Sequence, residues 1–336
     1  MTEEQVNSLL TKGLFNGKPL HGKLVETHIS WVILTDQFVF KIKKPLKLSF
    51  LDYSSLELRK ENCEKEILLN SRYTDIYLEV LSIRHLNGKW FINGDKGEIL
   101  DHLVQMKRMD TALEMDKLLQ EDKVKEAQIK SLADVISTFH QRAEITYHPF
   151  DIQEARLTFN DLHQAIEIVN KELGSSYIEI IHSAINWSDN FLKKHHGRFA
   201  ERVELGYQRD VHGDLHSGNI FLYDTPILFD GIEFNEEFRQ IDLLYEIAFL
   251  CMDLEAFGKD ELAVKFLEYY HPKLKCIIIE EDEAIFTYYK CLRANIRAKV
   301  HAVSAHHAHD DIYRYEHLNE IKKYLSLIRR YMGSGI

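Results

Sequence analysis

One stretch of the sequence gathers side chains that could carry out chemistry. Residues 211–222 read Val-His-Gly-Asp-Leu-His-Ser-Gly-Asn-Ile-Phe-Leu, and residues 227–231 read Ile-Leu-Phe-Asp-Gly. Asp214, Asn219 and Asp230 therefore stand among apolar runs that are typical of short strands. Phosphoryl-transfer sites show this pattern, because one Asp orients a hydroxyl while an Asn and a second Asp hold magnesium. We expect Asp214 to be the catalytic carboxylate, and Asn219 and Asp230 to be ligands of Mg²⁺.

The apolar runs beside these residues predict how the two metal ligands come together. Residues 219–222 and 227–229 are expected to form a small hairpin, closed by the turn sequence Tyr-Asp-Thr-Pro. Such a hairpin places Asn219 and Asp230 at the same open end. Hard cations such as Mg²⁺ take oxygen ligands and keep several waters, so an amide and a carboxylate suit the site.

Two histidines in the same stretch, His212 and His216, allow a second interpretation. A His-x-Asp-x-His sequence could belong to a transition-metal site, but no third nitrogen ligand stands at a diagnostic spacing. The neighbouring Asn219 is better explained by magnesium. We expect both imidazoles to hold the catalytic loop in shape through hydrogen bonds.

Bulk composition limits the kinds of protein this can be. The chain has 336 residues, above the roughly 250–300 at which a single core stops growing, so two lobes are expected. A hydrophobic content of 45% with 28% charged residues is typical of a folded globular chain. The formal net charge of −11 argues against a general nucleic-acid-binding protein, because phosphate backbones require a basic surface. A small anionic ligand stays possible, since it responds to the local field of its pocket.

The cysteines and the first residues of the sequence help to predict the cellular compartment. The 4 cysteines are scattered and form no Cys-x-x-Cys pair, so neither a zinc knuckle nor a redox motif is indicated. The first residues are acidic and lack an apolar signal core. No run approaches the roughly 18 apolar residues of a membrane span. We expect a reduced, cytoplasmic protein with no membrane partner, and the sequence leaves its oligomeric state open.

The pattern of elements changes along the chain from strands to helices. Short strands are expected from residue 24 to about 105, interrupted by one helix that starts at Ser54 or Ser55 and reaches about residue 73. Asn87-Gly88 predicts a hairpin between the strands 77–86 and 89–93. After residue 110 the apolar residues repeat at helical spacing. The sequence thus predicts an α+β fold with a β-rich lobe over 1–105, a hinge at 106–110 and a helical lobe over 111–336.

Several motifs in the sequence resemble those of a known superfamily. The motif His-Gly-Asp-x-His-x-x-Asn at 212–219, with Phe-Asp at 229–230, resembles the aminoglycoside phosphotransferase and choline kinase branch of the protein-kinase-like fold. Residues 26–32, 39–45 and 50–52 are similar to an uncharacterised bacterial group in that branch, whose members are often fused to a P-loop kinase-like domain. No Gly-x-x-x-x-Gly-Lys-Ser/Thr motif occurs here, so the stand-alone form is expected. The resemblance covers nearly the whole chain and implies a two-lobed fold that uses ATP or GTP with Mg²⁺.

The resemblance also assigns nucleotide-binding residues. Lys41, in Val-Phe-Lys-Ile, matches the lysine that holds the α- and β-phosphates, and Glu66 is the expected helix carboxylate beside it. Lys43 shares a strand face with Lys41 and therefore competes for this role. Residues 105–109, Gln-Met-Lys-Arg-Met, look like the inter-lobe segment whose backbone would meet adenine, which implicates Met106 and Arg108.

The loop that covers phosphates in protein kinases is different here. No Gly-x-Gly-x-x-Gly sequence is present, and Thr27-His28-Ile29-Ser30 occupies the expected place. Backbone amides and the hydroxyl of Ser30 or Thr27 are expected to meet phosphate, less closely than glycine would allow. This departure keeps a catalytically inactive relative open as an alternative.

A basic stripe on a later helix bears on the acceptor. Lys290, Arg293 and Arg297 share one face of a helix expected over 286–302, and His301 continues that face. The stripe is either a solvated surface or an acceptor pocket for an anionic substrate, since Arg binds carboxylate and phosphate through two parallel hydrogen bonds.

Asp242 has two interpretations as well. Its position is similar to that of an Asp that braces the catalytic loop in the superfamily. A negative charge at a helix start is the other interpretation, because the helix dipole favours it there.

The expected function is a phosphotransferase that uses ATP or GTP and Mg²⁺ to phosphorylate a hydroxyl of a small molecule. The alternative is a nucleotide-binding pseudokinase that acts as a regulatory or scaffold module. A kinase acting on protein side chains is disfavoured, because no peptide-docking or activation segment is recognisable. The stretch between Asp230 and Asp242 is short, which favours small acceptors.

Overall fold

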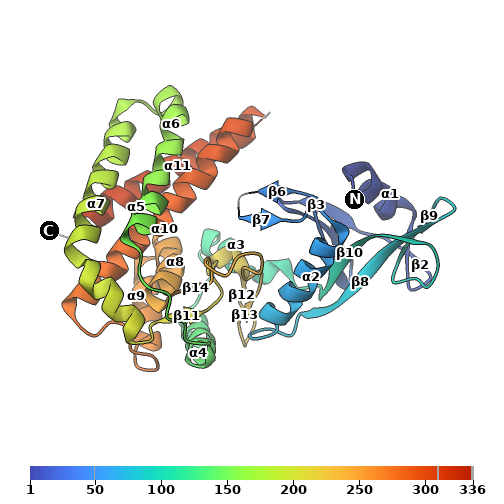
Figure 1. The fold of residues 1–336 in the computed structure, drawn as a ribbon, viewed down its shortest axis with the longest axis horizontal. Coiled ribbons are helices and arrows are strands. Elements are labelled where there is room, and N and C mark those ends of the chain that lie inside the picture. The colour runs from blue at the N-terminus through green and yellow to red at the C-terminus, as the bar shows by residue number, and fades with distance from the viewer. Residues whose placement is uncertain (49, 309, 334–336) are drawn as a thin grey trace. The chain divides into compact units, whose positions relative to one another are not determined.

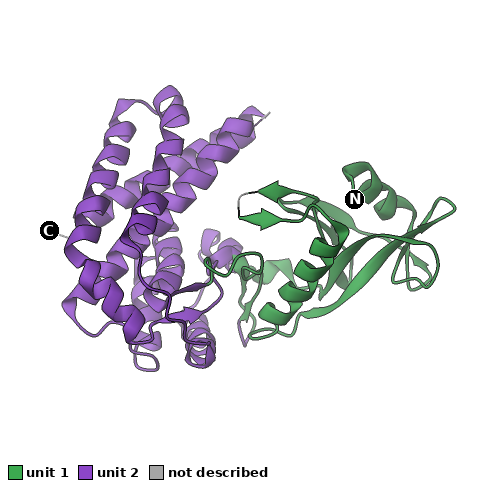
Figure 2. Cartoon of the chain, viewed as in Figure 1, with its two compact units in different colours: residues 1–114, 219–223, 227–239 green, residues 115–218, 224–226, 240–336 purple. Residues whose placement is uncertain are grey.

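The computed structural model describes residues 1–48, 50–308 and 310–333. The chain divides into two compact units, shown in green and purple in Figure 2. Unit 1 comprises Met1–Glu114, Asn219–Tyr223 and Ile227–Arg239, and unit 2 comprises Met115–Gly218, Asp224–Pro226 and Gln240–Ile336.

Unit 1 is built on a large, mostly antiparallel sheet (Figure 1). Within the described residues its strand order is β2-β1-β9-β8-β10-β5-β4-β3, and only β1 and β9 pair in parallel. The strands of this sheet are β1 (Gly13–Phe15), β2 (Lys18–Pro19), β3 (Lys23–Glu26), β4 (Ser30–Leu34), β5 (Phe38–Lys43), β8 (Tyr77–Leu86), β9 (Lys89–Ile92) and β10 (Glu98–Lys107).

Strand β5 has one face in the apolar core and an opposite face that carries two lysines. Phe40 and Ile42 are fully buried in an apolar cluster that also contains Ile33 of β4. Because side chains alternate along a strand, Lys41 and Lys43 project from the opposite face. The predicted sharing of a face by these two lysines is therefore confirmed by the contacts described below.

Helix α2 (Leu56–Asn70) covers that second face and packs against β8 and β10. Ser55 caps its start, since the Ser55 hydroxyl accepts a hydrogen bond from the amide of Leu58 at 3.2 Å. Cys63, Glu66 and Asn70 are buried on its inner side. A helix with buried Glu and Asn side chains requires polar partners, and the sheet supplies them. The shorter helix α1 (Glu3–Lys12) lies near β1 and β9.

The turn between β8 and β9 agrees with its predicted sequence signal. Asn87 and Gly88 both have positive φ, 48° and 78°. Two consecutive left-handed residues form the tight hairpin turn that favours Asn-Gly. The pairing Leu86↔Lys89 directly beside the turn follows from it.

Two small hairpins complete unit 1, and one of them changes the predicted division of the chain. They are β6–β7 (Lys47–Leu48 and Leu51–Asp52) and β12–β13 (Ile220–Phe221 and Ile227–Leu228). The predicted lobe boundary at 106–110 differs from the structure, because β10 runs to Lys107 and unit 1 continues to Glu114. Residues 219–239, expected in the helical lobe, lie largely in unit 1, because Leu222 donates its amide to Leu113 at 2.8 Å and Ile227 packs on the cluster around Val104.

Unit 2 is mostly helical (Figure 1). Its α-helices are α3 (Met115–Gln120), α4 (Glu126–Arg142), α5 (Ile152–Asn160), α6 (Ile166–Glu172), α7 (Ser175–Glu204), α8 (Leu243–Ala256), α9 (Asp260–Tyr270), α10 (Glu280–His307) and α11 (Asp311–Gly333). Helix α10 packs against α7, α8 and α11, and α4 packs against α9. The remaining elements are the 3₁₀ turns η1 (Thr111–Leu113, in unit 1), η2 (Asp161–Ala165) and η3 (Ser217–Asn219), and the paired strands β11 (Gln208–Asp210) and β14 (Gln240–Asp242).

Helix α8 begins directly after a short strand. Strand β14 occupies residues 240–242, and Asp242 is the residue that caps α8. Asp242 accepts a hydrogen bond from the amide of Leu244 at 2.7 Å, and its two carboxylate oxygens bind the buried Arg202 at 2.7 and 2.8 Å. The helix-start interpretation of Asp242 is therefore confirmed.

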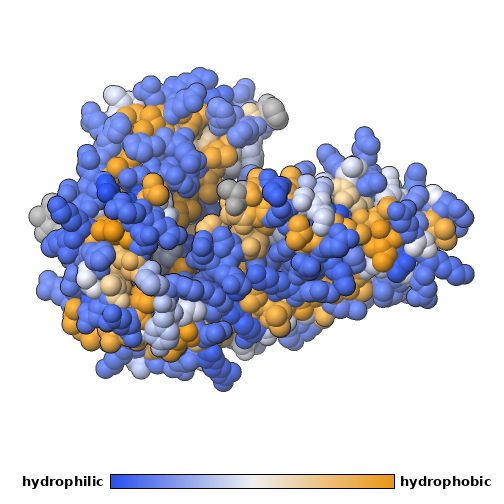
Figure 3. Space-filling model, viewed as in Figure 1, coloured by the Kyte–Doolittle hydropathy of each residue, from blue (hydrophilic) through white to orange (hydrophobic). Residues whose placement is uncertain are grey.

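Polar residues cover most of the face seen in Figure 3, with apolar residues between them in small groups. No helix in the described part of the chain is both long enough and apolar enough to cross a membrane.

Candidate functional site

The Lys41 amino group of β5 lies between two carboxylates in unit 1. Its Nζ is 2.8 Å from Glu66 Oε1 on α2 and 2.5 Å from Asp230 Oδ1, which follows β13. Burial alone would lower the pKa of Lys41, but Asp230, Glu66 and Glu233 raise it well above its ordinary value. Lys41 is thus held as a cation, and the structure brings together the predicted phosphate-binding lysine, its helix carboxylate and one predicted metal ligand.

A second lysine completes this ion-pair cluster. Lys43 Nζ is 2.7 Å from Glu66 Oε2 and also pairs with Glu233 and the hydroxyl of Tyr53. Tyr53 donates its hydroxyl to Glu233 at 2.8 Å. Glu66 therefore gives one oxygen to each lysine, so the competition between Lys41 and Lys43 resolves into two positions around one carboxylate.

The centre of the cluster is buried, and its opposite charges stabilise one another. Glu66 is fully buried, and the side chains of Lys43 and Glu233 are 1% and 4% exposed. Burial alone would raise the pKa of Glu66, but Lys41 and Lys43 lower it to about 2. Removing one member of such a cluster leaves an uncompensated buried charge, which typically costs about 3–5 kcal/mol.

Sequence reasoning did not identify Glu233. Its signal was its position three residues after Asp230, in a segment that the Asp already tied to the site. Nothing in a strand or helix period marked it, since residues 229–239 form no long element.

Asp230 and Asn219 occupy the open end of the β12–β13 hairpin, as predicted. The amide of Phe229 donates to the carbonyl of Asn219 at 3.1 Å, which places the next residue, Asp230, beside Asn219 along the hairpin. Asp230 has φ 61°, an uncommon backbone conformation for a residue with a side chain. Two groups hold it there: Tyr77 accepts from the amide of Asp230 at 2.9 Å, and Asn70 accepts from the amide of Gly231 at 2.9 Å.

These residues fit a magnesium ion that also uses phosphate and water ligands. The side chain of Asp230 is 46% exposed and Asn219 is 7% exposed, so the pair offers one accessible carboxylate and one largely buried amide. No group of three or more His, Cys, Asp or Glu suited to a metal is found among the described residues. A site made of few protein oxygens is what Mg²⁺ prefers when a substrate supplies phosphate ligands.

Three other residues predicted to bind nucleotide are buried or already use a backbone group in a hydrogen bond. Ser30 is fully buried and its hydroxyl has no hydrogen-bond partner in the described residues, which corrects the expectation that this hydroxyl meets phosphate. The Thr27 hydroxyl, the other candidate, accepts the amide of Ser30 at 3.0 Å inside the turn. Met106 is 7% exposed within β10, and the amide of Arg108 donates to Gln37 at 2.9 Å. Any contact of Arg108 with adenine would therefore use its carbonyl group or its side chain.

In unit 2, the loop around Asp214 is held by its backbone. Glu246 of α8 is fully buried and accepts the amides of His212 at 3.0 Å and Gly213 at 3.1 Å. Gly213 has φ 84°, a conformation that suits glycine because it lacks a Cβ atom. The predicted bracing role of His212 agrees with its contacts, since its Nδ1 accepts the amide of Asp214 at 3.2 Å.

The carboxylate of Asp214 stays accessible and ionised. Its side chain is 40% exposed, and Oδ2 lies 3.5 Å from Nε2 of His216. Burial works against the charge, but His216, His212 and Arg293 lower the pKa of Asp214 well below its ordinary range. His216 also accepts the amide of Gly218 at 3.1 Å through Nδ1, so it shapes the loop and faces the carboxylate at once.

A second side chain on α8 holds the end of the loop. Asp253 accepts the amide of Ser217 at 2.8 Å and also its hydroxyl. Sequence reasoning missed both Glu246 and Asp253. Their signal was the presence of two acids in the otherwise apolar helix 243–254, where a charge needs a specific partner.

The three basic residues predicted on one face of α10 have different contacts. Lys290 pairs with Glu255 at 2.7 Å. Arg293 is 6% exposed, donates to the carbonyl of Gly213 at 3.1 Å and stacks 3.8 Å from the ring centre of Tyr245. Arg293 therefore contacts the loop around Asp214, in contrast to the expected acceptor pocket. Of the three predicted residues, Arg297 lines a pocket of unit 2.

Comparisons with known proteins found related sequences and similar solved structures. No model of a known protein family matches the chain. An uncharacterised protein of Mycobacterium tuberculosis (strain H37Rv) and one of Mycobacterium bovis are each 31% identical over 287 residues, covering 83% of this chain and 54% of the relative. The chain thus spans about half the length of the curated relatives it matches.

Solved structures decide the fold. Similar ones are the GDP complex of an aminoglycoside 2′-phosphotransferase (12% identical, TM-score 0.53, covering 91% of this chain and 92% of that one), a spectinomycin phosphotransferase with ADP and spectinomycin (12%, 0.52, 98% and 98%), and a choline/ethanolamine kinase family protein from Mesorhizobium loti (8%, 0.51, 94% and 92%). The chain has the fold of the aminoglycoside phosphotransferase and choline kinase superfamily. The predicted kinase-like α+β fold of this superfamily is therefore confirmed, while the roles of individual residues stay predictions.

Proposed function

We propose that the chain is a phosphotransferase that moves the terminal phosphoryl group of ATP or GTP to a hydroxyl of a small molecule, with Mg²⁺ as cofactor. The observation that carries the proposal is the position of Lys41 between Glu66 and Asp230. A lysine fixed beside a carboxylate that could hold a metal ion suits a nucleoside triphosphate, because phosphates and metal must be held together.

In this proposal unit 1 binds the nucleotide. Lys41 binds phosphate oxygens, and Glu66 with Lys43 keeps the Lys41 amino group in place. Asn219 and Asp230 would hold magnesium, which supplies positive charge to the phosphate oxygens when bound. The left-handed backbone at Asp230, held by Tyr77 and Asn70, fixes the direction of its carboxylate.

The catalytic loop of unit 2 supplies the carboxylate that acts on the acceptor. Asp214 accepts a hydrogen bond from the acceptor hydroxyl and orients its oxygen toward the γ-phosphorus. A new bond forms between that oxygen and phosphorus, the bond from phosphorus to the β–γ bridging oxygen breaks, and the hydroxyl proton passes to Asp214. Because the pKa of Asp214 is low, its carboxylate is a weak base, so orientation is its larger contribution.

Two features support a small acceptor and a purine nucleotide. The segment from Gly231 to Arg239 is short and folds back into unit 1, so no long peptide-binding segment follows Asp230. The similar phosphotransferases were solved with GDP or ADP, and one of them also holds the small acceptor spectinomycin.

Transfer of the labelled γ-phosphate from ATP or GTP, in the presence of Mg²⁺, to a pool of small metabolites tests the proposal. The wild-type chain should form labelled products, and Asp214→Asn should lower that rate roughly 10²- to 10⁴-fold while binding nucleotide as tightly. If both chains bind nucleotide and neither transfers phosphate to any compound, the chain is a nucleotide-binding pseudokinase module and the proposal is wrong.

A further inference from the structure

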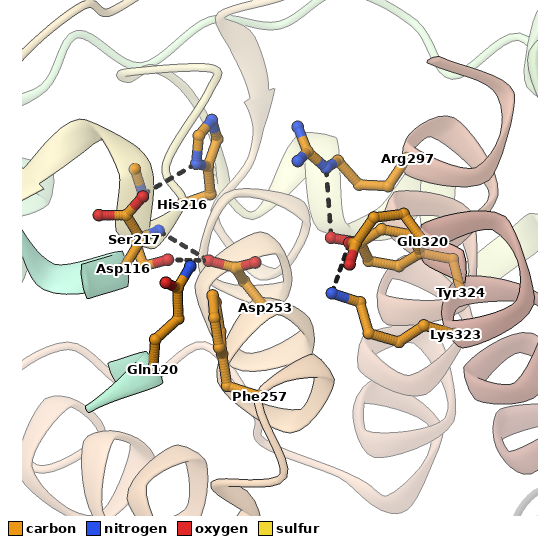
Figure 4. A pocket seen from close by; sticks show the side chains of 11 residues that line it. Asp116, Gln120, His216, Ser217, Asp253, Phe257, Arg297, Glu320, Lys323 and Tyr324 are labelled. Atoms are coloured by element: carbon orange, nitrogen blue, oxygen red, sulfur yellow. Dashed lines mark hydrogen bonds and ion pairs between the residues drawn. The ribbon is translucent and has the colours of Figure 1, made fainter. Parts of the chain in front are cut away.

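A pocket in unit 2 lies directly beside the catalytic loop (Figure 4). Its volume is about 220 Å³, below the roughly 300–1,000 Å³ of sites for drug-sized ligands, so it suits a small molecule. Its lining comes from α3, the catalytic loop, α8, α10 and α11: Asp116, Gln120, His216, Ser217, Gly218, Asp253, Phe257, Arg297, Glu320, Lys323 and Tyr324. His216, which lines the pocket, is 3.5 Å from the Asp214 carboxylate, so one side chain links the pocket to the proposed catalytic group.

The two walls of the pocket differ in their charge. In Figure 4, His216, Asp116, Gln120 and Asp253 line one side, and Arg297 with residues of α11 lines the other. The carboxylate of Asp253 is used by the backbone and hydroxyl of Ser217. On the second wall, Glu320 pairs with Lys323 at 2.5 Å, so these two charges compensate each other.

Among the described residues that line this pocket, Arg297 is a cation without a close carboxylate partner. Among the described residues its guanidinium contacts the Tyr324 hydroxyl at 3.5 Å and His301 Nε2 at 3.5 Å, both long for a hydrogen bond. The interior arginines Arg198 and Arg202 of the same unit bind Asp282, each at 2.8 Å or less. An arginine turned into a pocket with only neutral, distant partners retains several N–H donors for a ligand.

The surroundings keep Arg297 charged and its neighbour neutral. Burial works against its charge, but the Tyr324 phenol, Asp253 and Asp214 raise the pKa of Arg297. Burial, Arg297, His317 and Lys323 lower the pKa of His301 to about 3, so the imidazole offers no competing charge at neutral pH.

The opposite wall supplies groups that suit hydroxyls. Asp116 lines the pocket, and its Oδ1 accepts the amide of its neighbour Lys117 at 2.7 Å. Gln120 adds an amide that can both donate and accept. A carboxylate and an amide on one wall recognise several hydroxyl groups, while the guanidinium on the other recognises an anion.

We infer that this pocket binds the acceptor, and that the acceptor is a small polyhydroxylated anion whose carboxylate or phosphate pairs with Arg297. The inference rests on the proposed phosphotransferase function. It narrows the predicted basic stripe to one residue, because Lys290 and Arg293 are occupied by Glu255 and by the catalytic loop.

Direct binding to the full chain tests the inference without requiring turnover. Isothermal titration with gluconate, glucose 6-phosphate, glucose and glucosamine compares a carboxylate, a phosphate, a neutral sugar and a cationic one on six-carbon skeletons. One or both anions should bind at least 10-fold more tightly than glucose and glucosamine, and the stronger of the two identifies the anionic group.

Substitutions then locate the binding. Arg297→Met should weaken binding of the preferred anion roughly 10- to 100-fold, and Arg297→Lys should weaken it less, because the charge stays while the paired N–H donors are lost. Lys299→Met is the matched control, since Lys299 lies on the same helix, pairs with Asp161 at 3.1 Å and does not line the pocket. It should bind the anion like the wild type, and circular dichroism should show all variants folded.

Three results would overturn the inference: tighter binding of glucosamine than of both anions, no binding of either anion, or equal binding by Arg297→Met and the wild type. The failure of phosphate transfer is a separate outcome. If anions bind through Arg297 but the wild type transfers no phosphate to them or to any metabolite, the pocket assignment stands and the proposed function does not.

Discussion

The cluster around Lys41 and the loop around Asp214 hold their charged groups in opposite ways. In unit 1 the charges neutralise one another: Lys41 and Lys43 pair with Glu66, Asp230 and Glu233. In unit 2 the buried carboxylate of Glu246 binds backbone amides, and the carboxylate of Asp214 stays 40% exposed.

This difference determines whether a substitution affects the stability of the fold and the proposed function together or separately. In the cluster, the side chains proposed to bind nucleotide also compensate buried charges, so a substitution there should damage the fold and the function together. In the loop, Asp214 can change without leaving a buried charge, because its neighbours are held through the backbone. Substitutions in the cluster should therefore reduce both stability and activity, whereas Asp214 substitutions should reduce activity with little loss of stability.

The largest effect on stability is expected for Lys43→Met. This change leaves Glu66 and Glu233 without one buried cation each, which should lower the free energy of unfolding by about 3–5 kcal/mol. Asp214→Asn should lower it by less than about 1 kcal/mol, in line with substitutions at exposed sites. Urea unfolding followed by circular dichroism measures both.

The double variant Lys43→Met/Glu233→Leu is the control, because it removes the cation and one of its anions together. It should recover part of the loss if charge compensation is the cause. Equal destabilisation by Lys43→Met and Asp214→Asn would contradict the contrast between the units.

Glu246→Gln should have an intermediate effect. The amide side chain retains one acceptor but loses the charge that binds the amides of His212 and Gly213, so about 1.5–3 kcal/mol of unfolding free energy should be lost. The loop should also become less well placed, with kcat lowered roughly 10-fold and the KM for nucleotide nearly unchanged. A rise in the nucleotide KM with constant kcat would show that Glu246 does not act through the catalytic loop.

A more gradual effect is expected from acid. The pKa of Glu66 is depressed to about 2 in the folded chain, so its contribution to stability is complete above the ordinary carboxyl pKa of about 4.5. That contribution should be lost as the pH falls from about 4.5 toward 2. Glu66→Gln should show a flatter dependence of unfolding free energy on pH over this window, and parallel curves for the two chains would refute the assignment.

The smallest effect is expected at Ser30. Its hydroxyl is buried without a partner among the described residues, so Ser30→Ala should leave the chain equally stable or up to about 1 kcal/mol more stable. The nucleotide KM should stay within about 2-fold of the wild type. An increase of 10-fold or more would show that the Ser30 hydroxyl reaches phosphate after all.

How far the sequence predicted the site depended on the distance between partners along the chain. Strand alternation correctly placed Lys41 and Lys43 on one face, and the family resemblance pointed to Glu66 as the helix carboxylate beside Lys41. Neither signal could identify Glu233 as the partner of Lys43, because these residues are 190 positions apart and only the tertiary fold joins them.

The stripe on α10 shows a different limit. Lys290, Arg293 and Arg297 do lie at helical spacing, but α10 packs against α7, α8 and α11. Residues on one face of such a helix meet different neighbours along its length, so one predicted pocket became three separate contacts. Only the structure could show that Arg293 contacts the carbonyl of Gly213.

The most direct test of the account is the magnesium dependence of ATP binding, measured by isothermal titration on the wild type, Asp230→Asn and Asp214→Asn. If unit 1 carries the nucleotide and metal site, Mg²⁺ should tighten ATP binding to the wild type and to Asp214→Asn equally, and should do so at least 10-fold less for Asp230→Asn. Loss of the magnesium effect in Asp214→Asn, or its persistence in Asp230→Asn, would contradict the division of binding and catalysis between the two units.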